Sequence, residues 1–456
     1  MRTLLSLAIL FLSLSTFAQN FKGDWEGELN VMGQRLPIIL HIVNTDNSYQ
    51  VTMDSPKQGA KDIPVDASLK ENQQLVVQSG AMGLELPLTK LHEDTLQGIF
   101  SQGGMNIPIT FYRINNQVIA EVQTHNFKAT SFNIDLQSHL ISGEVDTPLS
   151  GDNFPVVVLI SGSGPQDRNS TVFGHDLFLE LANYFTKNGW AVVRFDERGT
   201  GKSTGNFSTS TTTDFAKDVS AVVDHIATLP SLNKNQIILI GHSEGGIIAP
   251  MVAQPHPQVK AFISLAGVTA APKELLKAQA HLTAQSQGMN EAALKAYDSL
   301  YAQQIELVYK RSPENKDSID AQLQSLIAQQ IKDNGVTGEQ AQIMLDAAMA
   351  QFTSPWISHF ARMNVSDITQ NLNKPAFYIF GEKDIQVPAE LNKLSLEKDL
   401  KEKQQAQTQI KVLADHNHLM QKCTTCTLDE YWDLEGGYST ESLTLMLEWL
   451  NEIKDM

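Results

Sequence analysis

The first part of the chain alternates apolar and polar residues in short runs. Between Phe21 and Arg113, runs such as LPIILHIV and SYQVTM are separated by Gly, Asn and Asp. A period of two places apolar side chains on one face of a strand, and the residues between the runs favour turns. We therefore predict a small antiparallel β domain over residues 19–117, and we find no group of catalytic residue types within it.

A different pattern begins at about Val118, where apolar runs alternate with amphipathic stretches. Nearly continuous runs of Val, Ile and Leu are typical of strands that are covered on both faces. The pattern predicts an α/β fold over residues 118–456, with a mainly parallel sheet wrapped by helices. The expected strands are 155–162, 191–199, 236–243, 259–267, 375–384 and 409–415.

One long segment interrupts the predicted sheet without adding a strand. Residues 272–362 are rich in Ala, Gln, Leu and Met, with helical spacing in KELLKAQAHLTAQ and EQAQIMLDAAMAQF. Ligands bind α/β sheets at the carboxyl ends of their strands, where such an insertion would lie. We expect a helical cap that acts as a lid.

The N-terminus has the pattern of a secretory signal peptide. One basic residue precedes an apolar run from Leu4 to Leu14, and small or polar residues lead to Ala18. We expect cleavage after Ala18 and a periplasmic or secreted mature protein, with an uncleaved anchor as the alternative. The apolar run is shorter than the roughly 20 residues that a membrane span needs, and no other segment is apolar enough. We therefore expect no membrane span.

Charge narrows the possible partners. The 456 residues include 34 Lys and Arg against 51 Asp and Glu, which gives a net charge of −17. Such a chain repels nucleic acid phosphates and anionic lipid surfaces. Nucleic acid is therefore excluded as an expected partner.

The segment IILIGHSEGG carries the clearest chemical signal. A predicted strand ends at Gly241, Ser243 is central, and Gly245 and Gly246 open a helix. This is the G-x-S-x-G pattern in the order strand, sharp turn, helix that the motif requires. Glycine is needed because a Cβ in so crowded a turn would collide with its neighbours. We predict that Ser243 is the nucleophile of a serine hydrolase.

In this fold the acid and the base follow the serine in that order. Asp384 comes just after the strand PAFYIF, and we prefer it to its rival Glu382; the alternative is that Asp384 only caps the next helix. Two histidines, His416 and His418, follow the last predicted strand, and both fit the expected place of the base.

Two backbone N–H groups are expected to hold the negatively charged oxygen that develops during acyl transfer. One belongs to Glu244, the residue after the nucleophile, and the other to Ser163 in the loop ISGSGPQDRN, with Gly164 as the close alternative. The Glu244 carboxylate is interpreted as a helix N-terminal charge without a catalytic role. We expect Arg168 and Asp167 to pair with each other or to shape the leaving-group side of the site, with an ordinary structural ion pair as the alternative.

Two cysteines near the C-terminus leave several readings open. With His416 and His418, the pair Cys423 and Cys426 has the residue types of a zinc site, but zinc would leave no histidine for Ser243. We favour a local disulfide over a redox site or two free thiols, because paired cysteines oxidise outside the cytoplasm. We predict no metal and no cofactor. GTGKST lacks the first glycine of a phosphate-binding loop, and SGSGPQD lacks the third glycine of a dinucleotide fingerprint.

Five motifs together resemble a known family. SGSGPQDR, DERGTGKS, GHSEGG, GEKDIQVP and NHL are similar to those of secreted or periplasmic α/β-hydrolases of the serine-aminopeptidase-like group, which are mostly esterases. The resemblance covers residues from about Val118 to the C-terminus, and the β domain is similar to the N-terminal appendage of the group. It implies that His418 is the base and that His416 is exposed or supports it. Many relatives have histidine where this chain has Ser161.

The leading hypothesis is a serine esterase that cleaves a small-molecule carboxylic ester with a small or medium acyl chain. Ser243, His418 and Asp384 form its triad, and an acyl-enzyme is its intermediate. The first alternative is an aminopeptidase-like serine peptidase, in which Glu244 or a lid carboxylate holds the substrate ammonium. The second is a non-catalytic binding protein, whose β domain binds a substrate or partner.

Overall fold

The structure is a computed structural model that describes residues 21–456, apart from residues 32–33, 46–47, 57–59, 71–73, 81, 93, 103–104 and 115–125. The predicted signal peptide lies outside the described residues. The chain divides into two compact units, with the division between Thr124 and His125, and each unit is described by itself.

The first unit is a closed antiparallel barrel. Each strand pairs with the next, and β1 also pairs with β8, which closes the sheet. Trp25, Leu40 and Phe111 are fully buried in its core. The predicted antiparallel β domain is confirmed, and closure leaves its sheet without a free edge. The strands are β1 Gly23–Val31, β2 Gln34–Thr45, β3 Ser48–Ser55, β4 Ala60–Leu69, β5 Leu75–Ser79, β6 Leu84–His92, β7 Thr95–Gln102 and β8 Met105–Arg113.

The second unit has an eight-stranded sheet in the order β18-β17-β16-β15-β11-β14-β10-β9. The pairs from β18 to β14 are parallel, and β10 is antiparallel to both its neighbours. The α/β prediction is confirmed, but β9 and β10 were not predicted. The strands of this sheet are β9 Phe127–Asp135, β10 Leu140–Pro148, β11 Phe154–Ile160, β14 Ala191–Phe195, β15 Leu232–His242, β16 Val259–Leu265, β17 Ala376–Gly381 and β18 Thr408–Leu413.

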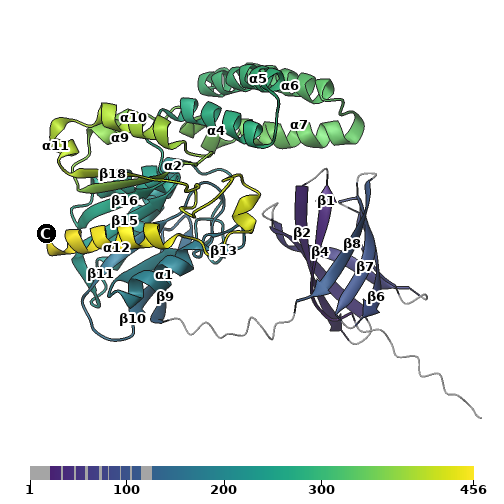
Figure 1. The fold of residues 1–456 in the computed structure, drawn as a ribbon, viewed down its shortest axis with the longest axis horizontal. Helices are drawn as coiled ribbons and strands as arrows, with labels where there is room; N and C mark the ends of the chain where they lie inside the picture. The colour runs from purple at the N-terminus through teal and green to yellow at the C-terminus, as the bar shows by residue number, and fades with distance from the viewer. Residues whose placement is uncertain are drawn as a thin grey trace, which may run out of the picture. The chain divides into compact units, whose positions relative to one another are not determined.

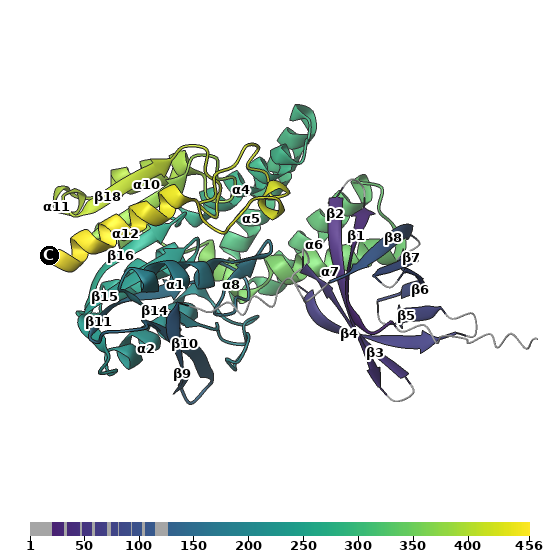
Figure 2. The ribbon, with the colours of Figure 1, turned by 60° about the horizontal axis from the view of Figure 1, so that its bottom comes forward.

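Helices cover both faces of this sheet (Figures 1 and 2). Apolar side chains of α2, α3 and α10 pack on one face, and those of α1 and α12 pack on the other. Sheet burial on both faces explains why the central strands are nearly all apolar. The bounds are α1 Leu177–Lys187, α2 Thr212–Ile226, α3 Gly245–Ala253, α9 Val365–Gln370, α10 Ala389–Asp399, α11 Glu402–Gln405, η2 Glu430–Trp432 and α12 Thr440–Asp455, with a short hairpin of β12 Thr171–Val172 and β13 His175–Asp176.

The predicted helical insertion follows β16 and forms a separate layer of helices (Figure 1). It has its own apolar core, which includes Ile305 and Leu323. At its start, the N–H groups of Thr269 and Ala270 donate to the side-chain oxygen of Asn392, at 2.9 and 3.0 Å. Asn392 is fully buried and also accepts the Thr269 hydroxyl at its carbonyl oxygen. The helices are α4 Pro272–Ser286, α5 Glu291–Lys310, α6 Lys316–Asp333, α7 Gly338–Phe352 and α8 Pro355–Phe360.

Within the part of the chain that the structure describes, no helix combines the length and the apolar character that crossing a bilayer requires.

Candidate active site

Ser243 lies in a tight turn between β15 and α3. Its φ of 55° is in the left-handed region, and its N–H donates to the carbonyl of Leu265 at 2.9 Å. A Cβ on Gly241 would lie 1.9 Å from the carbonyl oxygen of Gly245, and a Cβ on Gly245 would lie 2.3 Å from that of Ile160. Only glycine fits at these two positions. The order of strand, turn and helix that the motif predicts is therefore present.

His418 and Asp384 form a buried pair at the ends of β18 and β17. The imidazole Nδ1 lies 2.7 Å from the carboxylate Oδ2, and the two side chains are 5% and 0% exposed. The other carboxylate oxygen accepts the N–H groups of Gln386 and Val387 at 2.7 and 2.8 Å. This arrangement fixes the ring so that Nδ1–H donates to the carboxylate and Nε2 is left as the basic nitrogen.

Two residues that the sequence analysis did not assign hold the backbone of His418. The Tyr431 hydroxyl oxygen accepts its N–H at 3.1 Å, and Nε2–H of His242 donates to its carbonyl at 2.9 Å. Burial and the neighbouring His418 lower the pKa of His242 to about 3. His242 is therefore neutral at physiological pH, which suits its role as a donor to a carbonyl.

Ser243 and His418 both line a cavity of about 150 Å³. Ser163 and Glu244, the expected oxyanion residues, also line it. The helical insertion supplies part of the apolar wall through Leu275 and Leu276 of α4 and Trp356 and Phe360 of α8. The cavity is thus shared between the sheet edge and the insertion, as the lid prediction requires.

The Glu244 carboxylate is buried, with the residue 2% exposed. Its Oε1 accepts the Thr212 hydroxyl at 2.6 Å and the Trp356 indole N–H at 2.8 Å, and the carboxylate also accepts the Ser163 hydroxyl. Burial raises its pKa, and these hydrogen bonds oppose the rise. Glu244 precedes α3 but makes no side-chain cap on it. The carboxylate lies at the N-terminus of α3, as interpreted from the sequence, but the donors it meets come from α2, the lid and the oxyanion loop.

Glu197, just beyond β14, holds both ends of the predicted oxyanion loop. Its carboxyl oxygens accept the Ser161 hydroxyl at 2.7 Å and the Gln166 N–H at 3.0 Å. Burial raises the pKa of Glu197 to about 8, so the group is mostly protonated at neutral pH. The Ser161 hydroxyl is neutral and supplies no charge that would hold Glu197 ionised.

The same loop is tied to β14 by an ion pair. Arg168 binds Asp196 through its backbone N–H, its Nε and its Nη2, at 2.8, 3.0 and 2.6 Å, and it also binds Glu144 at 2.9 Å. The partner of Arg168 is therefore Asp196, whereas Asp167 instead accepts the backbone N–H of Asn169 at 3.0 Å. The predicted pairing of Arg168 with Asp167 is therefore not formed, because the Asp167 side chain turns back onto its own loop.

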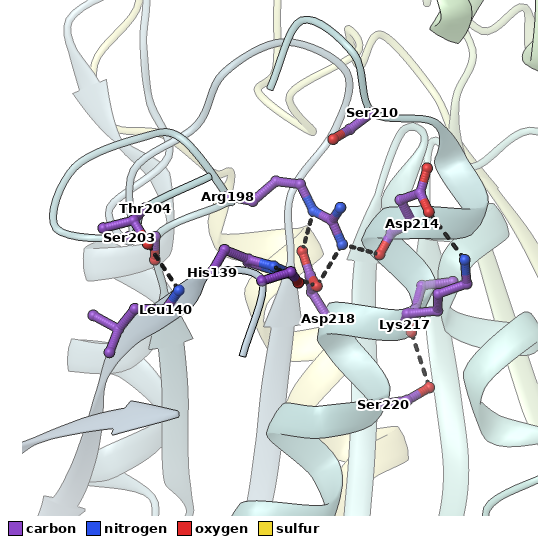
Figure 3. A network of polar contacts seen from close by, with 12 residues as sticks. His139, Leu140, Arg198, Ser203, Thr204, Ser210, Asp214, Lys217, Asp218 and Ser220 are labelled. Carbon is purple, nitrogen blue, oxygen red and sulfur yellow. Dashed lines mark hydrogen bonds and ion pairs between the residues drawn. The ribbon is translucent and has the colours of Figure 1, made fainter. Parts of the chain in front are cut away.

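A second ion pair anchors the turn that follows Glu197 (Figure 3). Arg198 binds both carboxylate oxygens of Asp218 in α2 at 2.6 Å and donates to the Asp214 carbonyl at 2.8 Å. His139, in the turn between β9 and β10, lies 2.9 Å from the same Asp218 carboxylate. These contacts fix the turn against α2, the helix whose first residue, Thr212, reaches Glu244.

The two histidines of the C-terminal segment have different partners. His416 is fully buried, with its ring nitrogens 2.7 Å from the Ala414 carbonyl oxygen and 2.7 Å from the Ser439 hydroxyl oxygen. The expectation that it could be exposed is wrong. The sulfur atoms of Cys423 and Cys426 lie at disulfide distance, 2.03 Å. Among the described residues, no group of three or more His, Cys, Asp and Glu side chains is arranged to hold a metal ion.

Comparison with known proteins adds a family and several relatives. A family model described as serine aminopeptidase, S33, matches residues 175–420. Esterase EstD of Thermotoga maritima is 23% identical over 120 residues, which are 26% of this chain and 29% of that protein. The chain therefore spans less than a third of the length of this relative.

Solved structures with low sequence identity also match the chain. The alpha/beta hydrolase GrgF from Penicillium sp. sh18 is 16% identical, with a TM-score of 0.44 over 72% of this chain and 100% of that one. The esterase PF2001 of Pyrococcus furiosus is 16% identical, with a TM-score of 0.45 over 72% and 91%. Est1E of Butyrivibrio proteoclasticus, solved with ferulic acid bound, is 16% identical, with a TM-score of 0.39 over 71% and 97%.

Proposed function

The chain belongs to the serine aminopeptidase S33 family, and from that premise we propose that it is a serine esterase that uses Ser243, His418 and Asp384. Membership makes it an esterase-like α/β hydrolase, whereas the triad and the substrate are our proposals. The observation that carries the proposal is the buried His418–Asp384 hydrogen bond of 2.7 Å in a cavity that Ser243 also lines.

The proposed reaction begins when the Ser243 hydroxyl attacks the ester carbonyl and His418 Nε2 takes its proton. Asp384 stabilises the resulting imidazolium, and the N–H groups of Ser163 and Glu244 hold the oxyanion. As the C–O bond breaks, His418 returns the proton to the leaving alcohol. Water then attacks the acyl-enzyme with His418 as base, which releases the carboxylic acid and frees Ser243.

The cavity supports a small or medium acyl group. Its volume of about 150 Å³ is below the several hundred Å³ of cavities that hold larger ligands. Leu275, Leu276 and Phe360 give it apolar walls, which suit an alkyl or aryl chain better than a charged group. We also propose action outside the cytoplasm, supported by the signal-like N-terminus and the paired cysteines.

Peptidase activity is the second candidate, and the contacts of Glu244 count against it. An enzyme that removes N-terminal residues needs a carboxylate for the substrate ammonium. Among the described residues that line the cavity, Glu244 alone has a carboxylate. That carboxylate already accepts the side chains of Thr212, Trp356 and Ser163. An ammonium would have to displace one of these donors, which favours ester substrates.

Covalent labelling tests the proposal. A fluorophosphonate should modify the folded protein at Ser243, Ser243→Ala should take no label, and p-nitrophenyl acetate and butyrate should be hydrolysed faster than aminoacyl p-nitroanilides. Peptide mapping would locate the label. Modification elsewhere, or no modification of folded protein, would overturn the triad, and faster anilide hydrolysis would favour the peptidase.

A further inference from the structure

We infer that the Glu244 side chain is a positioning residue that joins the lid to the oxyanion loop. The inference rests on the proposed function and adds a role for a carboxylate that takes no part in the triad. Its basis is the convergence of three side-chain donors, from the lid, from α2 and from the oxyanion loop, on one buried group.

The lid contact is made by Trp356, in the short helix α8. Its indole N–H donates to Glu244 Oε1 at 2.8 Å, and its ring stacks on Phe360 with the centroids 5.0 Å apart. Both rings also line the cavity. A shift of α8 would therefore change the acyl wall and break a hydrogen bond to the residue after the nucleophile.

The contact with the oxyanion loop is made by Ser163. Its hydroxyl donates to the Glu244 carboxylate, while its backbone N–H is the proposed second donor to the oxyanion. The first donor is the N–H of Glu244 itself. One carboxylate is thus linked to both donors, by a covalent backbone in one case and by a hydrogen bond in the other.

Burial makes this link sensitive to the lid. A buried carboxylate depends on its donors, because hydrogen bonds to charged groups are strong where water is excluded. Removing the Trp356 donor leaves Thr212 and Ser163 to satisfy the same carboxylate, and its position then changes. Because the Ser163 hydroxyl is bound to this carboxylate, we expect the Ser163 backbone to shift when the carboxylate moves.

The competing explanation is that Trp356 only fastens the lid to the hydrolase. The chain offers a matched control, because α2 and α8 are also joined by a direct hydrogen bond that does not involve Glu244. The Thr213 hydroxyl lies 2.9 Å from Nε2 of His359. Thr213→Val removes this tie and leaves Trp356 and Glu244 unchanged.

The test measures kcat and KM on p-nitrophenyl acetate for the full chain and for Trp356→Phe, Ser163→Ala and their double variant, with thermal unfolding as a check on folding. Each single variant should lower kcat about 10-fold, a fraction of the loss of a whole oxyanion donor, with KM changed less than about 2-fold. The double variant should fall well short of the roughly 100-fold product, because both changes break one linkage. Thr213→Val should retain kcat within about 2-fold.

If Trp356→Phe does not fold, Thr212→Val provides a second test of the inference. It removes a donor to the same carboxylate oxygen without touching the lid, and it should also lower kcat rather than raise KM. Multiplicative effects of Trp356→Phe and Ser163→Ala, losses confined to KM, or an equal loss in Thr213→Val would overturn the inference. A wild-type protein with neither turnover nor label would overturn the proposed function, which is a separate result.

Discussion

Buried carboxyl groups near Ser243 meet different partners, and their charge follows from those partners. Asp384 accepts two N–H groups and an imidazole that becomes cationic during the proposed reaction. Glu197 accepts a hydroxyl and one N–H, and burial raises its pKa to about 8. Near neutral pH, the oxyanion loop is therefore held mostly by a protonated acid.

The variant Glu197→Gln tests whether Glu197 is protonated in the native protein, through the pH dependence of the free energy of unfolding. Native Glu197 keeps its proton up to about pH 8, whereas the unfolded side chain loses it near pH 4.5. Its contribution to the free energy of unfolding is therefore full below about pH 4.5 and is lost as the pH rises to about 8. Glutamine resembles the protonated acid and cannot ionise, so Tm of the variant should rise relative to wild type between pH 5 and pH 9. Calorimetry would measure this.

An exposed site supplies the control for Glu197. Glu452→Gln, on the exposed side of α12, should show a pH-independent difference from wild type. A constant Tm difference for Glu197→Gln over the same range would show that Glu197 is ionised in the native state at all these pH values.

The two histidines give a second prediction at this scale. His418→Ala should abolish ester turnover, because Ser243 would lose its base. His416→Ala should remain active, although the loss of two buried hydrogen bonds is expected to cost about 1–3 kcal/mol of unfolding free energy. A metal chelator should leave turnover unchanged. Kinetics at constant pH would separate these cases, and inactivation by the chelator would mean that the segment binds a metal.

Sequence order could nominate the triad but not the groups around it. Ser243, Asp384 and His418 follow strand ends in an order that the fold requires. Glu197, Trp356 and Tyr431 have no such signal, because their partners are far away in the sequence and are set by packing. The same limit applies to Arg168: the sequence allowed a pairing with the adjacent Asp167 or an ordinary structural ion pair without a named partner, and the ion pair is found with Asp196, 28 residues away.

At the scale of elements, the continuous apolar strands of the hydrolase sheet and the alternating strands of the barrel were predictable, whereas β9 and β10 were not. β11 and β17 are buried throughout, so their continuous apolar sequences predict them as strands. β9 has only two buried residues among mostly exposed ones, and its apolar residues are too sparse to mark a strand. Closure of the barrel was also beyond sequence analysis, since it depends on the pairing of β1 with β8, whose registers no local pattern fixes.

The Cys423–Cys426 loop should contribute modestly to stability. Loop-closure entropy for so short a ring corresponds to about 2 kcal/mol. Its backbone has another restraint, because the Glu430 carboxylate accepts the N–H groups of Thr424, Thr425 and Cys426 at 2.7, 2.7 and 2.5 Å. Replacing both cysteines with serine should therefore lower the unfolding free energy by at most that amount and leave turnover within about 3-fold.

Denaturant unfolding and ester kinetics would measure the two effects. Glu430→Gln in the wild-type background is the matched change, and it should be tolerated while the cysteines are joined. Combining Glu430→Gln with the two serine substitutions should lower the free energy of unfolding by more than the sum of the separate losses, since either restraint alone can hold the loop. A large loss of turnover from the serine pair alone would show that the cysteine link itself holds the His418 loop.

At the scale of the whole molecule, the two units are self-contained. The barrel buries its own core around Trp25 and Phe111, and the hydrolase unit contains the complete sheet, lid and candidate site. Each unit has the size of an independent domain. The composition of the barrel gives no reason to assign it chemistry.

A chain of residues 126–456 should retain turnover of p-nitrophenyl acetate within about 3-fold of the full chain, because all the cavity-lining residues belong to the hydrolase unit. Parallel assays on small and polymeric esters would show what the barrel adds. Selective loss on the polymer would indicate a substrate-binding barrel. A folded truncated chain that is inactive on the small ester would mean that the barrel completes the site.

The anchoring of the lid at Asn392 has an evolutionary consequence. Asn392 lies in α10, outside the insertion, and it fastens the backbone of Thr269 and Ala270 before the first lid helix begins. The lid helices α4 to α7 can therefore lengthen, shorten or be exchanged by recombination without displacing the strand that ends beside the nucleophile, provided that α8 keeps the Trp356 contact with Glu244. Substrate preference can diversify in the cap while the sheet is inherited unchanged.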